Sequence, residues 1–285
     1  VVPFRAAGIP VVQTLHNTRN FCVNGVCLRE GRQCTDCGGK AVPVLGILRR
    51  CYHDSLVDSA GCAAFAMTGR LLRRLERGPQ LYFVLSEHHR RWFIADGIAP
   101  ERLLIRPSTV EVRDAGAGPR GDAVLYVGRL AAEKGVAELL EMWRRHHPGS
   151  RLLVVGDGPL GEAVEAAAAE DPTIEHRPYP GDAEVSRLME EARCLVFPTL
   201  APEAQPLVVI EALARGLPIV ASRHDSYVPS VRDGETALLV DPGDPAEVAS
   251  AIRRLTDFGG SELHARISAA QRRAFAEWHH PDRSI

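Results

Sequence analysis

The amino-acid sequence predicts an α/β protein of two Rossmann-like domains, each with a parallel sheet, of which the first is incomplete. Two observations predict this class. From residue 122 onward, short apolar segments alternate with segments of helical periodicity, which is the pattern of repeated β-α units. The apolar segments are continuous runs, as expected for parallel strands that helices cover on both faces.

The second half predicts a complete domain over residues 122–262. Helix 207–215 ends at Gly216, a residue that commonly adopts the left-handed conformation after a helix. We expect strands at residues 123–128, 151–156, 173–177, 194–198 and 218–222, and helices at residues 136–146, 160–170, 183–192, 207–215 and 245–255. Residues 263–285 predict a further helical segment that crosses back to the first domain.

The first half, residues 1–112, is less regular and precedes a Gly/Pro-rich linker at residues 113–121. A buried strand at residues 10–15 ends at His16, and a long Gly- and Cys-rich loop follows it to about residue 50. The remaining elements that we expect are a helix at residues 59–77, a strand at 80–85, a helix at 87–96 and a strand at 102–106.

Bulk composition restricts the classes of protein. The chain has 285 residues, 45% hydrophobic and 25% charged, as in ordinary globular proteins, and no apolar run of membrane-spanning length. The first 110 residues carry fifteen Lys and Arg against eight Asp and Glu, whereas the remainder carries nineteen against twenty-eight. This asymmetry argues against general nucleic-acid binding, and fits either a basic half facing an anionic acceptor or membrane, or chance variation. The start at Val1, without methionine, looks like that of a fragment.

Two pairs of residues carry the chemistry of the second half. Glu203 lies in the loop before helix 207–215, and Glu211 lies about one turn inside it, where a carboxylate near free backbone N–H groups can bind sugar hydroxyls beside a phosphate. Arg129 and Lys134 follow strand 123–128, and together they supply a planar fork and a point charge for a diphosphate. Taken alone, each glutamate would more often be a solvated helix residue.

These two segments together resemble the donor half of GT-B glycosyltransferases of family 4, the retaining group 1 transferases. The resemblance implies transfer of a sugar from a nucleotide-sugar donor to a saccharide or lipid-linked acceptor, with no cofactor required for catalysis. It implies catalytic roles for His16, Glu203, Arg129 and Lys134. It implies donor binding by Gly128, Arg129, Lys134, Gly156, Gly158, Glu203, Pro206, Leu207, Val208 and Glu211.

The sequence departs from the family at Ala204-Gln205, where Gly-Phe or a similar pair is usual. Alanine resists backbone shapes that glycine allows, so the departure affects the donor sugar near Glu203. Opening strands of the acceptor domain are also missing. A nucleotide-sugar-binding remnant with impaired catalysis is therefore the alternative function.

The segment Gly156-Asp-Gly-Pro-Leu-Gly161 matches the dinucleotide fingerprint, which makes an NAD-dependent oxidoreductase a distant alternative. Pro159 removes one amide that a pyrophosphate would need, and the fingerprint normally occupies the first β-α unit of its domain rather than the second. In the family, this turn borders the donor site.

Five cysteines fall within residues 22–51, namely Cys22, Cys27, Cys34, Cys37 and Cys51. The Cys34-x2-Cys37 spacing in a Gly-rich turn predicts a structural zinc site completed by Cys22 or Cys27 and by Cys51. Reduced thiols without a ligand, or a disulfide or redox role, are the alternatives. A zinc-dependent interaction module would explain this loop and leave the second half unexplained.

A basic amphipathic helix at residues 61–78 places Arg70, Arg73, Arg74 and Arg77 on one face, and Met67, Leu71 and Leu75 on another. The arginines are either solvated or in contact with anionic lipid headgroups. We expect a cytoplasmic protein, with peripheral contact at the inner face of the membrane as the open alternative.

Overall fold

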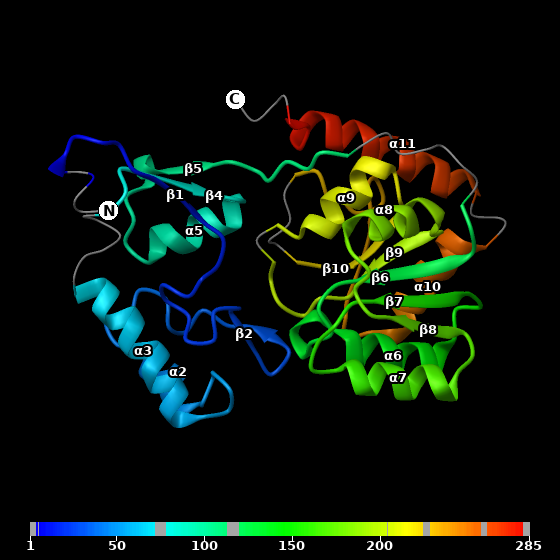
Figure 1. Cartoon of the computed structure of the whole chain (residues 1–285), viewed down its shortest axis with the longest axis horizontal. Coiled ribbons are helices and arrows are strands. Elements are labelled where there is room, and N and C mark those ends of the chain that lie inside the picture. Colours follow the sequence, from blue (N-terminus) through cyan, green and yellow to red (C-terminus); the bar gives the residue numbers. More distant parts are fainter. Residues whose placement is uncertain are drawn as a thin grey trace. The chain divides into compact units, whose positions relative to one another are not determined.

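The computed structural model describes Phe4 and residues 6–71, 78–112, 120–203, 205–224, 229–257 and 261–281 (Figure 1). The chain divides into two compact units. Unit 1 comprises Val1–Ser108, Ala201–Gln205 and Asp225–Val228, and unit 2 comprises Thr109–Leu200, Pro206–His224 and Pro229–Ile285. Most of the predicted linker, and the predicted extension of the basic helix to Arg73, Arg74, Leu75 and Arg77, lie outside the described residues.

Unit 2 contains a six-stranded parallel sheet in the order β11-β10-β9-β6-β7-β8. The strands are β6 (Ala123–Val127), β7 (Arg151–Val155), β8 (Ile174–Arg177), β9 (Cys194–Phe197), β10 (Ile219–Ser222) and β11 (Leu238–Val240). The chain runs outward from β6 through β7 to β8 and then returns to β9 on the other side of β6. The strand order therefore reverses beside β6, where open α/β sheets bind their ligands at the carboxyl ends of the strands.

Six helices cover the two faces of this sheet. Figure 1 shows α6 (Val136–His146), α7 (Gly161–Glu170) and α10 (Pro245–Thr256) on one face. The other face carries α8 (Asp182–Glu191), α9 (Leu207–Arg215) and α11 (Ser261–Trp278), and α11 packs along α9. Strand β11 was not predicted, because three residues bounded by Gly234 and Gly243 give little periodicity.

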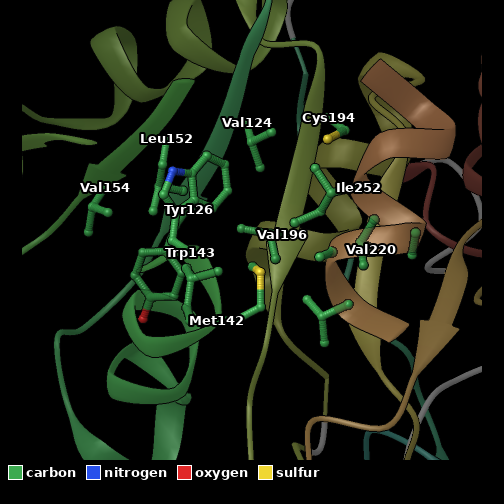
Figure 2. Packing of buried hydrophobic residues seen from close by; sticks show 14 of the residues in the cluster. Val124, Tyr126, Met142, Trp143, Leu152, Val154, Cys194, Val196, Val220 and Ile252 are labelled. Carbon is green, nitrogen blue, oxygen red and sulfur yellow. The ribbon is translucent and has the colours of Figure 1, made fainter. Parts of the chain in front are cut away.

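The core of unit 2 explains why its strands are uninterrupted apolar runs. Val124 and Tyr126 of β6 are buried with Val196 of β9, and they face Met142 and Trp143 of α6 (Figure 2). Every residue of β9 and of β10 is buried, as parallel strands covered on both faces require. The indole Nε1 of Trp143 donates to Thr173 Oγ1 at 3.2 Å, which satisfies the one polar atom of this side chain.

Unit 1 contains a three-stranded parallel sheet in the order β1-β4-β5. Its strands are β1 (Val12–Leu15), β4 (Leu81–Val84) and β5 (Leu103–Ile105), and its helices are α2 (Val44–Leu48), α3 (Leu56–Leu71) and α5 (Glu87–Ala95). The short hairpin β2 (Leu28–Arg29) and β3 (Arg32–Gln33) lies within the cysteine-containing segment. The core is small and consists of Leu15, Phe21, Cys27, Tyr82, Val84, Phe93, Ile98 and Leu103.

Three expectations for unit 1 were wrong. Strand β1 is largely exposed, because it pairs on one side with β4 and has no strand neighbour on the other among the described residues; only Leu15 of its four residues is buried. The segment from His16 to residue 50 is not a continuous loop, since it contains the hairpin and α2. Helix α3 buries Ser59, Ala63 and Ala66, whereas Leu71 of the predicted apolar face is 83% exposed.

Candidate functional site

Two glycine turns interlock where β6 and β7 end. A Cβ atom on Gly156 would lie 2.0 Å from the carbonyl oxygen of Gly128, and one on Gly158 would lie 2.4 Å from that of Leu130. Leu130 N–H donates to Asp157 O at 2.9 Å, which ties the two turns directly. The first two glycines of the G-x-G-x-x-G segment therefore serve the close approach of two backbones. Close packing of the two turns therefore explains these glycines without a bound dinucleotide. This explanation weakens the interpretation of the protein as an oxidoreductase.

Arg129 and Lys134 occupy the turn that follows β6. The exposed guanidinium of Arg129 forms an ion pair with the carboxylate of Glu133, and the Arg129 carbonyl accepts from Tyr126 Oη at 3.0 Å. Lys134 is half-buried and ends the 3-10 turn Ala132–Lys134. Both cations thus belong to one short turn with its own carboxylate.

The same turn is held against the segment that follows β9. Gly135 has φ of 72°, and a Cβ atom there would lie 1.9 Å from Pro198 O. The Glu133 carbonyl accepts from Leu200 N–H at 3.0 Å and from Thr199 Oγ1 at 3.2 Å. The strand order reverses between β6 and β9. The carboxyl ends of these two strands are therefore connected by hydrogen bonds to the Glu133 carbonyl.

Helix α9 begins at Leu207 with Pro206 in the N-cap position, as the sequence predicts. Pro206 offers no side-chain cap, and helix geometry gives the N–H groups of Leu207 and Val208 no acceptor within the helix. The side chain of Leu207 is 53% exposed. The helix start is therefore suited to receiving an anion by geometry and dipole.

Glu211 is half-buried on α9, one turn after the helix start. Burial raises the pKa of its carboxyl, the charge of Arg215 opposes this increase, and Asp182 adds to it. Arg215 Nη1 donates to the Glu211 backbone carbonyl at 3.0 Å, and Nη2 donates to Ser186 Oγ at 2.6 Å. The guanidinium therefore anchors α9 to α8 and compensates the Glu211 carboxylate only in part.

Sequence reasoning missed Tyr179 and Asp182, which lie near Glu211, and Asp157, which contacts Tyr179. Tyr179 N–H donates to Asp157 Oδ2 at 3.0 Å, and its phenol donates to the Asp182 carboxylate. The hydrogen bond to Asp182, followed by burial and by the charges of Asp182 and Glu211, raises the pKa of Tyr179. Tyr179 is 50% exposed, and only it and Leu207 are large exposed apolar side chains in the described part of unit 2. The position of Tyr179 just after β8 was the signal available in the sequence.

His16 and Glu203 belong to unit 1, so their predicted places opposite the donor remain predictions. His16 is exposed and directly follows β1. His16 acts on His89 of α5, a buried residue. Burial, followed by the charges of His88 and His16, lowers the pKa of His89 to about 4. Glu203 lies half-buried in the loop before α9, as predicted.

The departure from the family at Ala204-Gln205 is described only for its second residue, since Ala204 lies outside the described part. Gln205 is 8% exposed, and its Oε1 accepts from the N–H of Ser108. The glutamine therefore ties the segment before α9 to residue 108 rather than presenting a polar group to solvent.

All seven cysteines are free thiols. Cys22, Cys34, Cys37 and Cys51 line one small cavity, whereas Cys27 is fully buried and its thiol donates to Thr18 Oγ1 at 3.2 Å. Contact with the Cys27 thiol lowers the pKa of Cys22 to about 6, and the same contact, followed by burial, raises the pKa of Cys27. As they stand, the described side chains include no group of three or more His, Cys, Asp or Glu that could hold a metal ion.

The predicted basic helix is described as far as Leu71. Arg70 pairs with the carboxylate of Asp96, whose side chain is fully buried, so this arginine is engaged within unit 1. No helix among residues that the structure describes is both long and apolar enough to cross a membrane.

Comparison with known proteins identifies relatives of the second unit. Residues 121–257 match the family model described as glycosyl transferases group 1. A D-inositol 3-phosphate glycosyltransferase of Acidothermus cellulolyticus is 37% identical over 199 residues, covering 57% of this chain and 42% of that protein. A 2-deoxystreptamine glucosyltransferase of Streptomyces kanamyceticus is 31% identical over 198 residues, covering 65% and 48%. The chain thus spans less than half the length of these two relatives.

Solved structures share the fold over a longer stretch. Anabaena Alr3699/HepE in complex with UDP superposes with a TM-score of 0.70 at 17% identity, covering 98% of this chain and 71% of that one. Sucrose-phosphate synthase from Thermosynechococcus elongatus gives 0.62 at 23% identity, covering 84% and 63%. The fold is therefore GT-B, and residues 121–257 are similar to the group 1 glycosyl transferases.

Proposed function

We propose that this protein transfers a sugar from a nucleotide-sugar donor, with retention of configuration, to a saccharide or lipid-linked acceptor. The observation that carries the proposal is the composition of one sheet edge in unit 2. Four features lie at the carboxyl ends of the strands. They are two cations on one turn, glycine turns without room for side chains, an uncapped helix start and a half-buried glutamate. Such an edge suits a diphosphate attached to a hydroxyl-rich group.

Each group has a role in this proposal. Arg129, Lys134 and the amides of Leu207 and Val208 bind the diphosphate and stabilise its negative charge as the sugar departs. Glu211 accepts hydrogen bonds from the ribose. Glu203 and His16 contact the sugar, and their contribution is orientation. The reaction needs no catalytic cofactor in this scheme.

UDP is the first ligand to test, because it is the nucleotide in the Alr3699/HepE complex that shares the fold. Lys134→Ala removes one charge-assisted contact, typically about 1.5–3 kcal/mol, and should weaken UDP binding roughly 10- to 100-fold. Calorimetry measures the change. The matched control is Lys40→Ala, at an exposed lysine of unit 1. Equal affinities for the two variants would refute the diphosphate assignment.

Nucleotide-sugar binding without transfer is the second candidate function. It is favoured by the small core of unit 1, which carries His16, beside the extensive core of unit 2. The two candidates differ in one measurement. A transferase releases UDP from UDP-sugar faster when a saccharide or lipid-linked acceptor is added, whereas a binding protein shows the same slow release with or without it.

Contact with a membrane surface is a further part of the proposal. Helices α2 and α3 expose large apolar side chains, with Leu48 66% exposed, Val57 78% and Leu71 83%. Apolar side chains near arginines are typical of interfacial helices that lie on anionic lipid. A lipid-linked acceptor would then be met at the surface where it resides.

A further inference from the structure

The cysteine-containing segment of unit 1, residues 20–52, carries a site outside the donor half. Its thiols come from turns that its own backbone holds in place. Cys22 N–H donates to Thr18 O at 2.8 Å, Cys34 N–H to Cys27 O at 2.8 Å, and Cys51 N–H to Gly46 O at 3.1 Å. Each of these three cysteines is therefore held by a main-chain bond to a residue four to seven positions before it.

Four of these thiols share one cavity of about 20 Å³, to which Cys22, Cys34, Cys37 and Cys51 all contribute. A drug-sized or cofactor-sized ligand needs roughly 300 Å³ or more. The cavity has room for a single small ion or atom, so its size and the four cysteines among its ten lining residues together favour a metal ion over an organic molecule.

The segment packs closely around the sulfur of Cys37. A Cβ atom on Gly46 would lie 3.2 Å from Cys37 Sγ and 2.5 Å from Cγ2 of Val23. Val23 and Cys37 are buried in one small cluster, against which Cys51 packs. Cys37 and Cys51, fourteen residues apart in the sequence, are therefore brought together by packing.

The backbone of this segment is held in uncommon conformations. Among the described residues, every non-glycine residue with positive φ lies between Cys27 and Asp54. Cys27 itself has φ of 51°, directly before the hairpin. Such conformations are strained and persist where the surrounding structure over-determines them. A metal ion that crosslinks the turns would supply that constraint.

We propose that Cys22, Cys34, Cys37 and Cys51 bind one structural Zn²⁺ ion. Four sulfur ligands form the closed tetrahedral set of structural zinc sites, with Zn–S distances of about 2.3 Å. The side chains as they stand do not form a metal-binding group, so binding requires the four sulfur atoms to turn into the cavity. Cys27 is outside the set, because its thiol is buried against Thr18.

Zinc at this place would join the start of the segment to its end. Cys22 lies six residues after His16, and Cys51 lies between α2 and α3. The ion therefore stabilises the part of unit 1 that follows His16. This proposal is independent of the proposed function, because it rests on no donor contact and is tested without one.

The experiment measures zinc in untagged protein purified without chelator. Elemental analysis should find about one zinc per chain in the wild type, and less than about 0.1 in the double variant Cys34→Ser, Cys37→Ser. The matched control is Cys62→Ser, which removes a half-buried cysteine of α3 that does not line the cavity. It should retain the full zinc content, as should Cys27→Ser if the ligand set is correct.

A second measurement keeps the proposal testable if the double variant fails to fold. Wild-type protein reconstituted with Co²⁺ in place of Zn²⁺ should show the intense visible absorption of tetrahedral cobalt together with sulfur-to-cobalt charge transfer. Absence of zinc from fresh wild-type protein overturns the proposal, whether thiol titration then finds seven reduced cysteines or mass spectrometry finds a disulfide. Zinc loss in the Cys62→Ser control to the same extent as in the double variant would also overturn it.

Discussion

The two units differ in what their surfaces and cores are made of. Unit 2 buries an extensive apolar cluster between a six-stranded sheet and helices on both faces, and its large exposed apolar side chains within the described residues are Tyr179 and Leu207. Unit 1 has a three-stranded sheet and a small core, and it exposes large apolar side chains along α2, α3 and two of its strands. In unit 2, the large exposed apolar side chains therefore lie at the candidate donor site. In unit 1, such side chains are spread over an extended surface.

The largest effect should come from the interlocked turns of unit 2. Gly156→Ala places a Cβ atom 2.0 Å from Gly128 O, so we expect a loss of stability of about 3 kcal/mol or more, and a loss of UDP affinity greater than roughly 100-fold. Urea unfolding and calorimetry measure the two quantities. Gly161→Ala is the control, because no atom lies within 4 Å of the position that its Cβ would take and the residue begins a helix. Equal losses of stability and of UDP affinity in the two variants would contradict the role of the turns.

Hydrogen exchange should separate the two units. Because the core of unit 2 is larger, we expect amides of β6, β7 and β9 to exchange roughly 100-fold or more slowly than those of β1 and β5. Mass spectrometry of labelled peptides gives the rates. Uniform protection across both units would mean that unit 1 is as stable as unit 2, and would remove the support that its small core gives to binding without transfer.

The Glu211 carboxyl should confer a pH dependence on nucleotide binding. Because its pKa is raised, the carboxylate that accepts from the ribose in our proposal becomes protonated as the pH falls through a value above the ordinary 4.5. UDP affinity should then decrease by up to about tenfold as the pH is lowered from neutral toward 4.5, and this decrease should be absent in Glu211→Gln. Pyrophosphate, which has no ribose, serves as the control ligand. A parallel decrease for UDP and pyrophosphate would contradict the ribose contact.

The smallest effect concerns the exposed surface of unit 1. Replacing Leu48 and Leu71 by serine should reduce sedimentation with vesicles of anionic lipid by roughly two- to fivefold, since each change removes only part of the apolar contact. Binding to neutral vesicles controls for the charge contribution. Leu207→Ser, an exposed leucine of unit 2, should leave vesicle binding unchanged. If it lowers binding as much, the surface is not confined to α2 and α3.

The sequence predicted unit 2 well because its signal is local. Each strand is a short apolar run and each helix an amphipathic segment, so α6 and α9 were predicted to the residue, and most other boundaries to within one residue. The same local signal correctly placed Arg129 and Lys134 after a strand and Glu211 within a helix. Tyr179 and Asp182 escaped, because their meeting with Glu211 depends on how α8 and α9 pack. Periodicity along one segment contains no such information.

Unit 1 was harder to predict because tertiary contacts override its local pattern. The apolar face expected for α3 included Met67 and Leu71, yet the helix buries small residues, Ala63 and Ala66, where it packs closely. Strand β1 reads as a buried strand, since its sequence alone does not reveal that it has only one strand neighbour within the described part. The hairpin and α2 within the cysteine-containing segment depend on turns at residues with positive φ, which composition does not signal.

The ion pair between Arg129 and Glu133 restricts which anions can gain binding energy at this turn. An anion that reaches Arg129 meets a guanidinium already neutralised by a carboxylate, so it must displace one negative group to gain another. A monovalent anion gains little from that exchange. A diphosphate brings several oxygens and more than one charge, and it can engage Lys134 and the start of α9 at the same time. If the turn binds a diphosphate as proposed, Glu133 competes with ligands for Arg129 and makes the turn selective for polyvalent anions over the salts around it.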